Sequence, residues 1–346
     1  MKRALVLGGG GARGAFQVGM LRSLVIDQGL DFQVIRGISV GALNASFLAQ
    51  AETDGDSLLA MGNRVTALEN LWRHEIRGDD SVYEHRPGGV IGLAAGGDSM
   101  YSLAPLKRLL KRHLSLDQLR KSGRDFKVGT VSLVHGTYAE WGPEDPQFVE
   151  KVLASASIPV VFLFVRNASL KEVLVDGGVR NITPLASAFD ADPDEIYVLL
   201  TSRLVRNGPK LPDSGVQEQT YEEWVDNWLG SRVGGFDVLK RTVEILTDEI
   251  YLDDLRGALS WNGVLKSIQD VLKTANELGQ LPTDLTRALE NLRRSTRKIA
   301  APIYVLAPQQ WHGPGNSATD FSPALIDAGI EHGRQIGADK SKWLWP

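Results

Sequence analysis

Short apolar runs alternate with amphipathic stretches along the first part of the chain. Residues 3–7 form an apolar run that ends in glycine, and residues 15–28 carry apolar side chains at nearly helical spacing. Residues 32–38 then alternate like a strand, and a second helical stretch covers residues 42–51. This order of strand, glycine loop, helix, strand, sharp turn and helix is typical of the start of an α/β domain with a parallel sheet.

The pattern continues with a strand pair and with further buried strands. Residues 127–134 and 138–141 read as two neighbouring strands, and an apolar run over residues 172–175 leads into an Asp-Gly-Gly turn. The other elements that we predict in this part are helices over 57–75, 103–121 and 150–157 and strands over 160–165 and 195–201.

The region from residue 205 to residue 300 has a different pattern of apolar and polar residues. Prolines and a glycine first indicate a linker, and amphipathic helical patterns follow over residues 236–256, 258–278 and 283–298. Strand character then returns over residues 302–306, and a last helix is expected over residues 322–338.

Together these patterns predict a three-layer α/β/α fold with a mostly parallel central sheet and a helical insertion. The expected segments are an α/β core over 5–190, a core strand over 191–204, a linker and helical insertion or lobe over 205–300, a return to the core over 301–340 and a Trp-rich tail over 341–346.

Composition excludes several classes of protein and of site. The chain has 346 residues, of which 23% are charged, and a formal net charge of only -4, so a dedicated nucleic-acid binder is not expected. It contains no cysteine, which excludes disulfides, thiolate metal sites and a cysteine nucleophile. The apolar run after Lys2 and Arg3 is shorter than the roughly 7–15 residues of a secretory signal, and no run approaches the roughly 20 of a membrane span. We therefore expect a cytoplasmic protein.

A G-x-S-x-G pentapeptide lies between the second predicted strand and the helix that follows it. It reads Gly37-Ile38-Ser39-Val40-Gly41, the pattern of a nucleophile elbow, in which the serine lies on a strained turn between flanking glycines. The helix that follows directs its N-terminal amides towards the serine hydroxyl. Ser39 is therefore the candidate nucleophile.

A serine hydroxyl is a poor nucleophile and needs a base, and two candidates remain open. His312 lies late in the chain on a Trp-His-Gly-Pro loop, where a Ser-Asp-His esterase places its histidine. Asp176 follows an apolar strand and precedes Gly177 and Gly178, at the kind of strand end where open α/β sheets place ligands. An aspartate at the serine could take its proton directly, and burial that raises its pKa would make it a better base.

The glycine-rich stretch near the start of the chain also has two interpretations. Residues 9–14 match the dinucleotide pattern G-x-G-x-x-G, but the second strand ends in the elbow rather than in the acidic residue that holds a ribose. Alternatively the amides of Gly9, Gly10 and Gly11 form an oxyanion hole, and Arg13 anchors the loop or adds positive charge. The oxyanion interpretation fits the nearby serine better, while a catalytically inactive nucleotide-binding or interaction protein on the same core stays the alternative.

Four elements in this order resemble the patatin-like phospholipases. They are the glycine loop over residues 9–15, the elbow continued as GALNA over residues 41–45, the segment ASASIP over residues 154–159 and the Asp176 turn. The last strand and helix resemble the end of the fold of that family, and the region over 205–300 matches nothing that we can name.

The resemblance implies a specific chemistry. It implies a dyad in which Ser39 is the nucleophile and Asp176 the base, with Gly9, Gly10 and Gly11 as the oxyanion hole and Arg13 supporting their loop. It also implies hydrolysis of acyl esters of phospholipids or neutral lipids without calcium, any other metal or a cofactor.

Lipid substrates lie at an interface, so peripheral contact with a membrane surface is expected rather than insertion across it. Two parts of the sequence suit such contact, namely the amphipathic helices over 236–298 with their basic end and the tail Lys342-Trp343-Leu344-Trp345-Pro346. The competing interpretation is that the helices pack on the core of this same chain and that the terminal aromatic residues dock into a groove.

Overall fold

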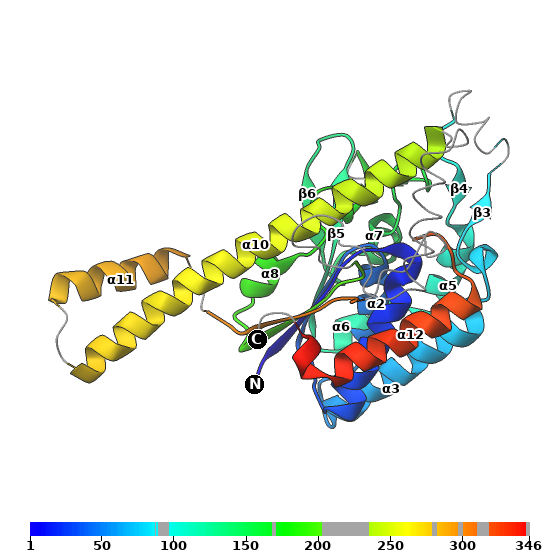
Figure 1. Ribbon diagram of the computed structural model, residues 1–346. Helices are drawn as coiled ribbons and strands as arrows, with labels where there is room; N and C mark the ends of the chain where they lie inside the picture. The colour runs from blue at the N-terminus through cyan, green and yellow to red at the C-terminus, as the bar shows by residue number, and fades with distance from the viewer. Residues whose placement is uncertain are drawn as a thin grey trace, which may run out of the picture.

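Parallel strands form the centre of the protein, as the apolar runs predict (Figure 1). The computed structural model describes residues 1–86, 88, 97–167, 171–202, 235–278, 282–296, 300–309 and 318–343. In these residues the central sheet has eight strands in the order β10-β9-β1-β2-β5-β8-β7, and β6 pairs with β5 outside this path. The strands are β1 (Arg3–Leu7), β2 (Val34–Gly37), β5 (Asp125–Ser132), β6 (Tyr138–Trp141), β7 (Val165–Asn167), β8 (Glu172–Asp176), β9 (Glu195–Leu199) and β10 (Ile303–Leu306).

The sheet is mixed but mostly parallel. Strands β10, β9, β1, β2 and β5 pair in parallel, whereas β6 and β8 pair with β5, and β7 with β8, in the antiparallel direction. Helices cover both faces, which confirms the predicted α/β class. They are α1 (Gly14–Leu21), α2 (Val40–Leu48), α3 (Ser57–Asn70), α5 (Ala104–His113), α6 (Leu116–Lys121), α7 (Phe148–Ser155), α8 (Leu185–Phe189), α10 (Gly235–Leu278), α11 (Thr283–Thr296) and α12 (Pro323–Ala338).

Alternate side chains of each strand enter different cores. Leu5 and Leu7 of β1 belong to the larger core, which lies under α1, α2, α3 and α12, while Ala4 and Val6 belong to the smaller core beside α8 and α10. All four side chains are fully buried, and this two-sided burial explains why the strand reads as a continuous apolar run.

Two helical boundaries differ from the sequence-based expectation. The stretch over 103–121 is two helices, because Leu114 is extended and the Ser115 hydroxyl caps α6 by accepting the amide N–H of Gln118. The first two patterns of the 205–300 region form the single helix α10, which passes through Gly257 without a break. A lone glycine weakens a helix by only about 1 kcal/mol, which is too little to end it.

The last helix, α12, packs very closely against α1. A Cβ atom added to Gly19 would lie 1.8 Å from the carbonyl oxygen of Ile330, and one added to Gly333 would lie 2.0 Å from that of Phe16. Glycine is thus required on both helices for their backbones to approach. Next to this crossing, α1 continues as a wider π-helical turn over Arg22–Asp27.

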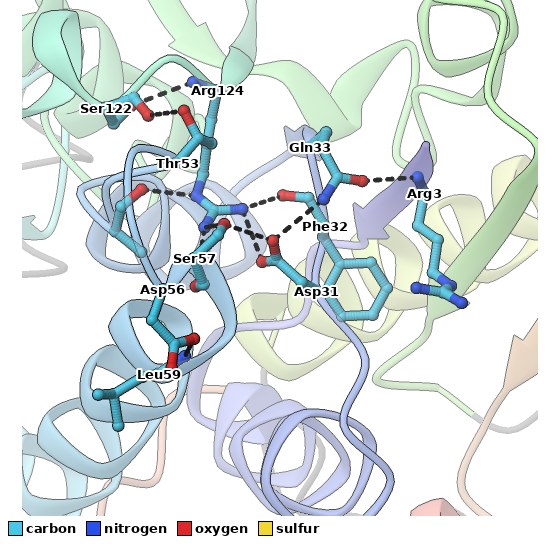
Figure 2. A network of polar contacts seen from close by, with 11 residues as sticks. Arg3, Asp31, Phe32, Gln33, Thr53, Asp56, Ser57, Leu59, Ser122 and Arg124 are labelled. Carbon is cyan, nitrogen blue, oxygen red and sulfur yellow. Dashed lines mark hydrogen bonds and ion pairs between the residues drawn. The ribbon is translucent and has the colours of Figure 1, made fainter. Parts of the chain in front are cut away.

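A buried arginine joins the N-terminal end of the sheet to its neighbouring loops (Figure 2). The guanidinium group of Arg124 pairs with Asp31 at 2.8 Å, and it also donates to the carbonyl oxygen of Ala51 at 2.6 Å and to the hydroxyl of Ser57 at 3.0 Å. Burial lowers the pKa of Arg124, and Asp31 opposes that shift. Asp31 therefore serves a structural ion pair.

Helices α10 and α11 extend from this body. In Figure 1 the later part of α10, in yellow, runs away from the sheet, and α11, in orange, lies beside its far end. The part of α10 nearest the sheet is anchored to the body. Leu255 is buried in the smaller core, and the Asn262 side chain exchanges hydrogen bonds of 2.8 and 3.0 Å with the backbone of Ala301. We call residues 255–278 of α10, together with α11, the helical arm.

Candidate active site

The G-x-S-x-G pentapeptide forms a sharp turn between β2 and α2. Ser39 has φ 56° and ψ −129°, a region that side-chain-bearing residues rarely adopt and that costs on the order of 1–3 kcal/mol. The flanking glycines are required by space: a Cβ atom on Gly37 would lie 2.5 Å from the oxygen of Gly41, and one on Gly41 would lie 2.1 Å from the oxygen of Leu7. The turn is therefore built to present the serine hydroxyl at the start of α2.

Asp176 ends β8 and is 4% exposed, while Ser39 is 6% exposed. Burial raises the pKa of the Asp176 carboxyl group to about 7, although hydrogen bonds from the Ser39 hydroxyl and the Gly178 amide lower it in part. The Gly178 amide donates to Oδ1 of Asp176 at 2.7 Å. A Cβ atom on Gly177 would lie 2.6 Å from the oxygen of Gly129, so the turn after Asp176 also needs its glycine.

Strand registers explain how these two residues meet. Along β5, β2 pairs up to Val128 and β8 pairs from Thr130 onwards, while β6 pairs with both positions. A strand has only two edges, so β6 occupies one and β2 and β8 share the other. Because β8 runs antiparallel to β5, the C-terminal ends of β2 and β8 face each other along that edge. Ser39 lies just after the end of β2, and Asp176 is the last residue of β8.

The glycine loop over residues 9–15, together with Gly8 before it, lies against Ser39. A Cβ atom on Gly9 would lie 3.0 Å from the Cβ of Ser39, and the carbonyl oxygen of Gly9 accepts the Thr201 hydroxyl. Gly10 and Gly11 have φ 149° and 57°, conformations that favour glycine. A Cβ atom on either would lie 1.9 Å from another group, the Thr201 hydroxyl for Gly10 and the carbonyl oxygen of residue 318 for Gly11.

The amides of this loop differ in their partners. Gly8 donates to Leu199 at 3.1 Å and Ala12 donates to residue 318 at 2.8 Å, whereas in the described part of the chain the amides of Gly10 and Gly11 donate no hydrogen bond. The Arg13 side chain turns back on the loop, and its Nε donates to the carbonyl oxygen of Gly10 at 3.3 Å. Within the described residues, these two amides therefore have no hydrogen-bond acceptor.

A buried polar network that the sequence reasoning missed connects the glycine loop to α2. The side-chain amide of Gln17 donates to the carbonyl oxygens of Gly8 and Leu199 at 2.8 and 3.1 Å and accepts from Asn44 at 3.0 Å. Asn44 in turn accepts the indole N–H of Trp72 at 3.0 Å. Gln17 and Asn44 are 0% and 1% exposed. The sequence signal for this network is the presence of two amide side chains, Gln17 and Asn44, within otherwise apolar helical stretches.

In the described part of the chain, no histidine contributes to the pKa shift of Asp176. That shift comes from burial and from the hydrogen bonds that the Ser39 hydroxyl and the Gly178 amide donate. His332 is buried edge-on against Phe16, with 4.9 Å between the ring centres. His312, the candidate base of a Ser-Asp-His esterase, lies outside the described residues.

Among the described residues, no group of three or more His, Asp or Glu side chains is arranged to hold a metal ion. In the same part of the chain, none of the helices combines the length and the apolar character that crossing a bilayer requires. Trp343 is buried, as in the interpretation that the terminal aromatic residues dock into a groove: its indole N–H donates to the carbonyl oxygen of Ile336 at 2.9 Å, and its ring packs on Tyr197 and Tyr304. Residues 344–346 lie outside the described residues.

Comparison with known proteins identifies the family. Residues 5–189 match the Patatin-like phospholipase family, which is more than half of the chain. The protein belongs to the patatin-like phospholipase family. This confirms the resemblance drawn from its motifs and supports a lipid acyl hydrolase in general terms.

Individual relatives share little sequence with this chain or match only a short part of it. A patatin-like phospholipase domain-containing protein of Caenorhabditis elegans is 36% identical over 81 residues, which cover 23% of this chain and 6% of that protein. VipD from Legionella pneumophila is 14% identical with a TM-score of 0.37, over 97% of this chain and 66% of VipD. ExoU of Pseudomonas aeruginosa, solved with SpcU, is 15% identical with a TM-score of 0.31, over 86% of this chain and 66% of that one. This patatin-like chain thus spans only part of each relative.

Proposed function

We propose that the protein is a serine acyl hydrolase that cleaves acyl esters of lipids through Ser39 and Asp176. The observation that carries the proposal is the meeting of a strained, buried serine with a buried carboxyl group whose pKa is raised to about 7. A base with a pKa near neutrality can both accept and return a proton at physiological pH. The family supports lipid esters as the substrate class.

The reaction follows in two halves. In the first, Ser39 Oγ forms a bond to the acyl carbon, its proton passes to Asp176, and the tetrahedral intermediate breaks its bond to the alcohol, which leaves with that proton. In the second, water attacks the acyl-serine, Asp176 takes a proton from the water and returns it to Ser39 Oγ, and the fatty acid leaves. No group other than water is consumed.

The glycine loop is proposed to hold the oxyanion of both tetrahedral intermediates. The amides of Gly10 and Gly11, unpaired within the described residues, are the proposed donors, and Gly9 allows the loop to approach Ser39. We propose that Arg13 supports this loop through its bond to Gly10. Removal of a single oxyanion donor costs about 10²–10³ in kcat in a well-studied serine protease.

A fluorophosphonate probe tests the nucleophile directly, because it phosphonylates an activated serine. We expect the wild type to be labelled and the Ser39→Ala variant to remain unlabelled, with loss of ester hydrolysis. Ser46→Ala is the matched control, since Ser46 is also buried but lies on α2 with its hydroxyl donating to the Leu43 carbonyl oxygen. Equal labelling of wild type and Ser39→Ala would overturn the proposal.

The Ser-Asp-His alternative is tested with the same assay. The proposed dyad predicts near-normal kcat for His312→Ala, whereas a triad that uses His312 predicts a loss close to that of Ser39→Ala.

Membrane contact through the helical arm remains a prediction of the same lipid chemistry, because the arm exposes several large apolar side chains. They are Trp261, Val264, Val271, Leu285 and Leu292.

A further inference from the structure

The end of α7 and the turn that follows it contact both members of the proposed dyad. The amide N–H of Ser39 donates to Oγ of Ser155 at 3.0 Å, and the amide N–H of Asp176 donates to the carbonyl oxygen of Ser157 at 3.0 Å. Both serines belong to the ASASIP segment over residues 154–159. The segment therefore bridges two strand ends that are distant in the chain.

Ser155 is positioned to act on the geometry of Ser39. Its side chain is 0% exposed, so water does not compete for the bond to the Ser39 amide. In the described residues this is the hydrogen bond that the Ser39 amide makes. A residue with φ 56° keeps that conformation only when its surroundings fix it, and an anchored amide restricts the same φ rotation.

We propose that Ser155 is a positioning residue for the nucleophile: its hydroxyl holds the Ser39 amide and thereby keeps Ser39 Oγ directed at Asp176. The proposal rests on the proposed function of Ser39 and Asp176. Ser155 does not touch the reacting atoms. Its loss should leave binding of the substrate intact and reduce the fraction of complexes in which the hydroxyl is aligned for attack.

Ser157 provides a matched control within the same segment. It is also 0% exposed, and its hydroxyl donates to the carbonyl oxygen of Leu153 at 3.0 Å. Its contact to Asp176 runs through the main-chain carbonyl, which a Ser157→Ala substitution retains. The two serine-to-alanine changes therefore remove the same atom at the same depth, but only one of them removes a bond to the dyad.

The experiment compares Ser155→Ala and Ser157→Ala with the wild type in hydrolysis of a soluble p-nitrophenyl ester, with kcat and KM measured separately and folded protein quantified by circular dichroism. For Ser155→Ala we expect kcat to fall about tenfold to hundredfold at nearly constant KM. For Ser157→Ala we expect kcat within about twofold of the wild type. Both variants should lose thermal stability to a similar extent, since each loses a buried hydrogen bond.

Similar kcat values for the two alanine variants, whether high or low, would overturn the positioning role. If Ser155→Ala does not fold, Ser155→Cys and Ser157→Cys carry the same comparison, because a thiol fills the site but accepts an N–H only weakly. The outcome is separable from that of the proposed function. Loss of labelling in Ser39→Ala with equal activity of the two Ser155 and Ser157 variants would retain the dyad and reject only the positioning role.

Discussion

The candidate active site and the helical arm leave very different fractions of their side chains in contact with solvent. Ser39 and Asp176 are 6% and 4% exposed, whereas Trp261 and Val271 of the arm are 62% and 46% exposed. The site is held by the ends of β2 and β8, the glycine loop and α7, while the arm is anchored mainly at its root. A change in the site should therefore alter catalysis, and a comparable change in the arm should alter only what the arm contacts.

The largest effect is expected when Asp176, the proposed base, is changed. Asp176→Asn keeps the shape of the side chain but cannot accept the proton of Ser39, so kcat/KM should fall roughly 10³- to 10⁴-fold, as when a catalytic triad loses a member. The matched change in the arm, Asp270→Asn at an exposed position, should leave kcat/KM unchanged. Steady-state hydrolysis of a soluble ester measures both, and an active Asp176→Asn enzyme would exclude Asp176 as the base.

The same substitution should stabilise the fold at alkaline pH. Burial raises the pKa of Asp176 from 3.8 to about 7, so between these values the folded protein binds more protons than the unfolded chain. The free energy of unfolding therefore decreases as pH rises through this window, and at pH 8 the folded protein carries a buried charge. Asp176→Asn avoids that charge and should gain at most about 4 kcal/mol at pH 8 and almost nothing near pH 4. Urea unfolding at both pH values tests this; a variant less stable at pH 8 would contradict it.

Catalysis itself should depend on the ionisation of Asp176. In the proposed mechanism the carboxylate form is the base, so kcat/KM should approach a tenfold fall per pH unit below the pKa of about 7, which amounts to roughly 50-fold from pH 7 to pH 5. A pH profile on a non-ionising ester measures this, with circular dichroism confirming that the fold persists. A constant rate down to pH 5 would show that no group with this pKa takes part.

Breaking the hydrogen-bond network of Gln17 should lower kcat less than a change in the proposed dyad does. It should lower the unfolding free energy more than a substitution of an exposed residue does. Gln17→Leu leaves the carbonyl oxygens of Gly8 and Leu199 without their buried donor, so we expect a loss of about 2 kcal/mol in unfolding free energy and about tenfold in kcat. Gln335→Leu, on the exposed side of α12, is the control and should change unfolding free energy by less than about 0.5 kcal/mol. Unchanged kcat in Gln17→Leu would show that the loop keeps its shape without the network.

The smallest effect is expected in the arm. Replacing Val264 and Val271 by serine removes exposed apolar surface that a bilayer could bury, so hydrolysis of phospholipid vesicles should slow about three- to tenfold. Hydrolysis of a soluble ester should stay within about twofold, which separates surface binding from chemistry. If vesicle and soluble rates respond alike, the arm does not contact the membrane.

The sequence predicted the local parts of this molecule well. The strand, turn and helix around Ser39 are specified by glycines within five positions, because each flanking Cβ atom would meet a backbone oxygen. The order of most strands and helices in the core likewise follows from apolar periodicity, although the strand predicted over 160–165 lies instead over Val165–Asn167. Local sterics and burial on both faces of the sheet carry this information, so they can be read without the rest of the chain.

Non-local parts could not be predicted in the same way. The orientation of β8 depends on which strand it pairs with, and its apolar run is compatible with either direction. The hydrogen bonds of Gln17 and the clash that excludes a side chain at Gly10 depend on Leu199 and Thr201, which lie far along the chain. The continuity of α10 was also missed, because Gly257 resembles a boundary but is tolerated within a helix.

The head-on approach of β2 and β8 also has a consequence for how the enzyme is made. During synthesis the Ser39 turn can form early, but the proposed base is added much later and reaches the serine only after β8 has paired with β5. Pairings between distant segments form slowly compared with local turns. A nascent chain would thus carry an inert serine until its antiparallel strand has docked, and the onset of esterase activity during refolding would time that docking step.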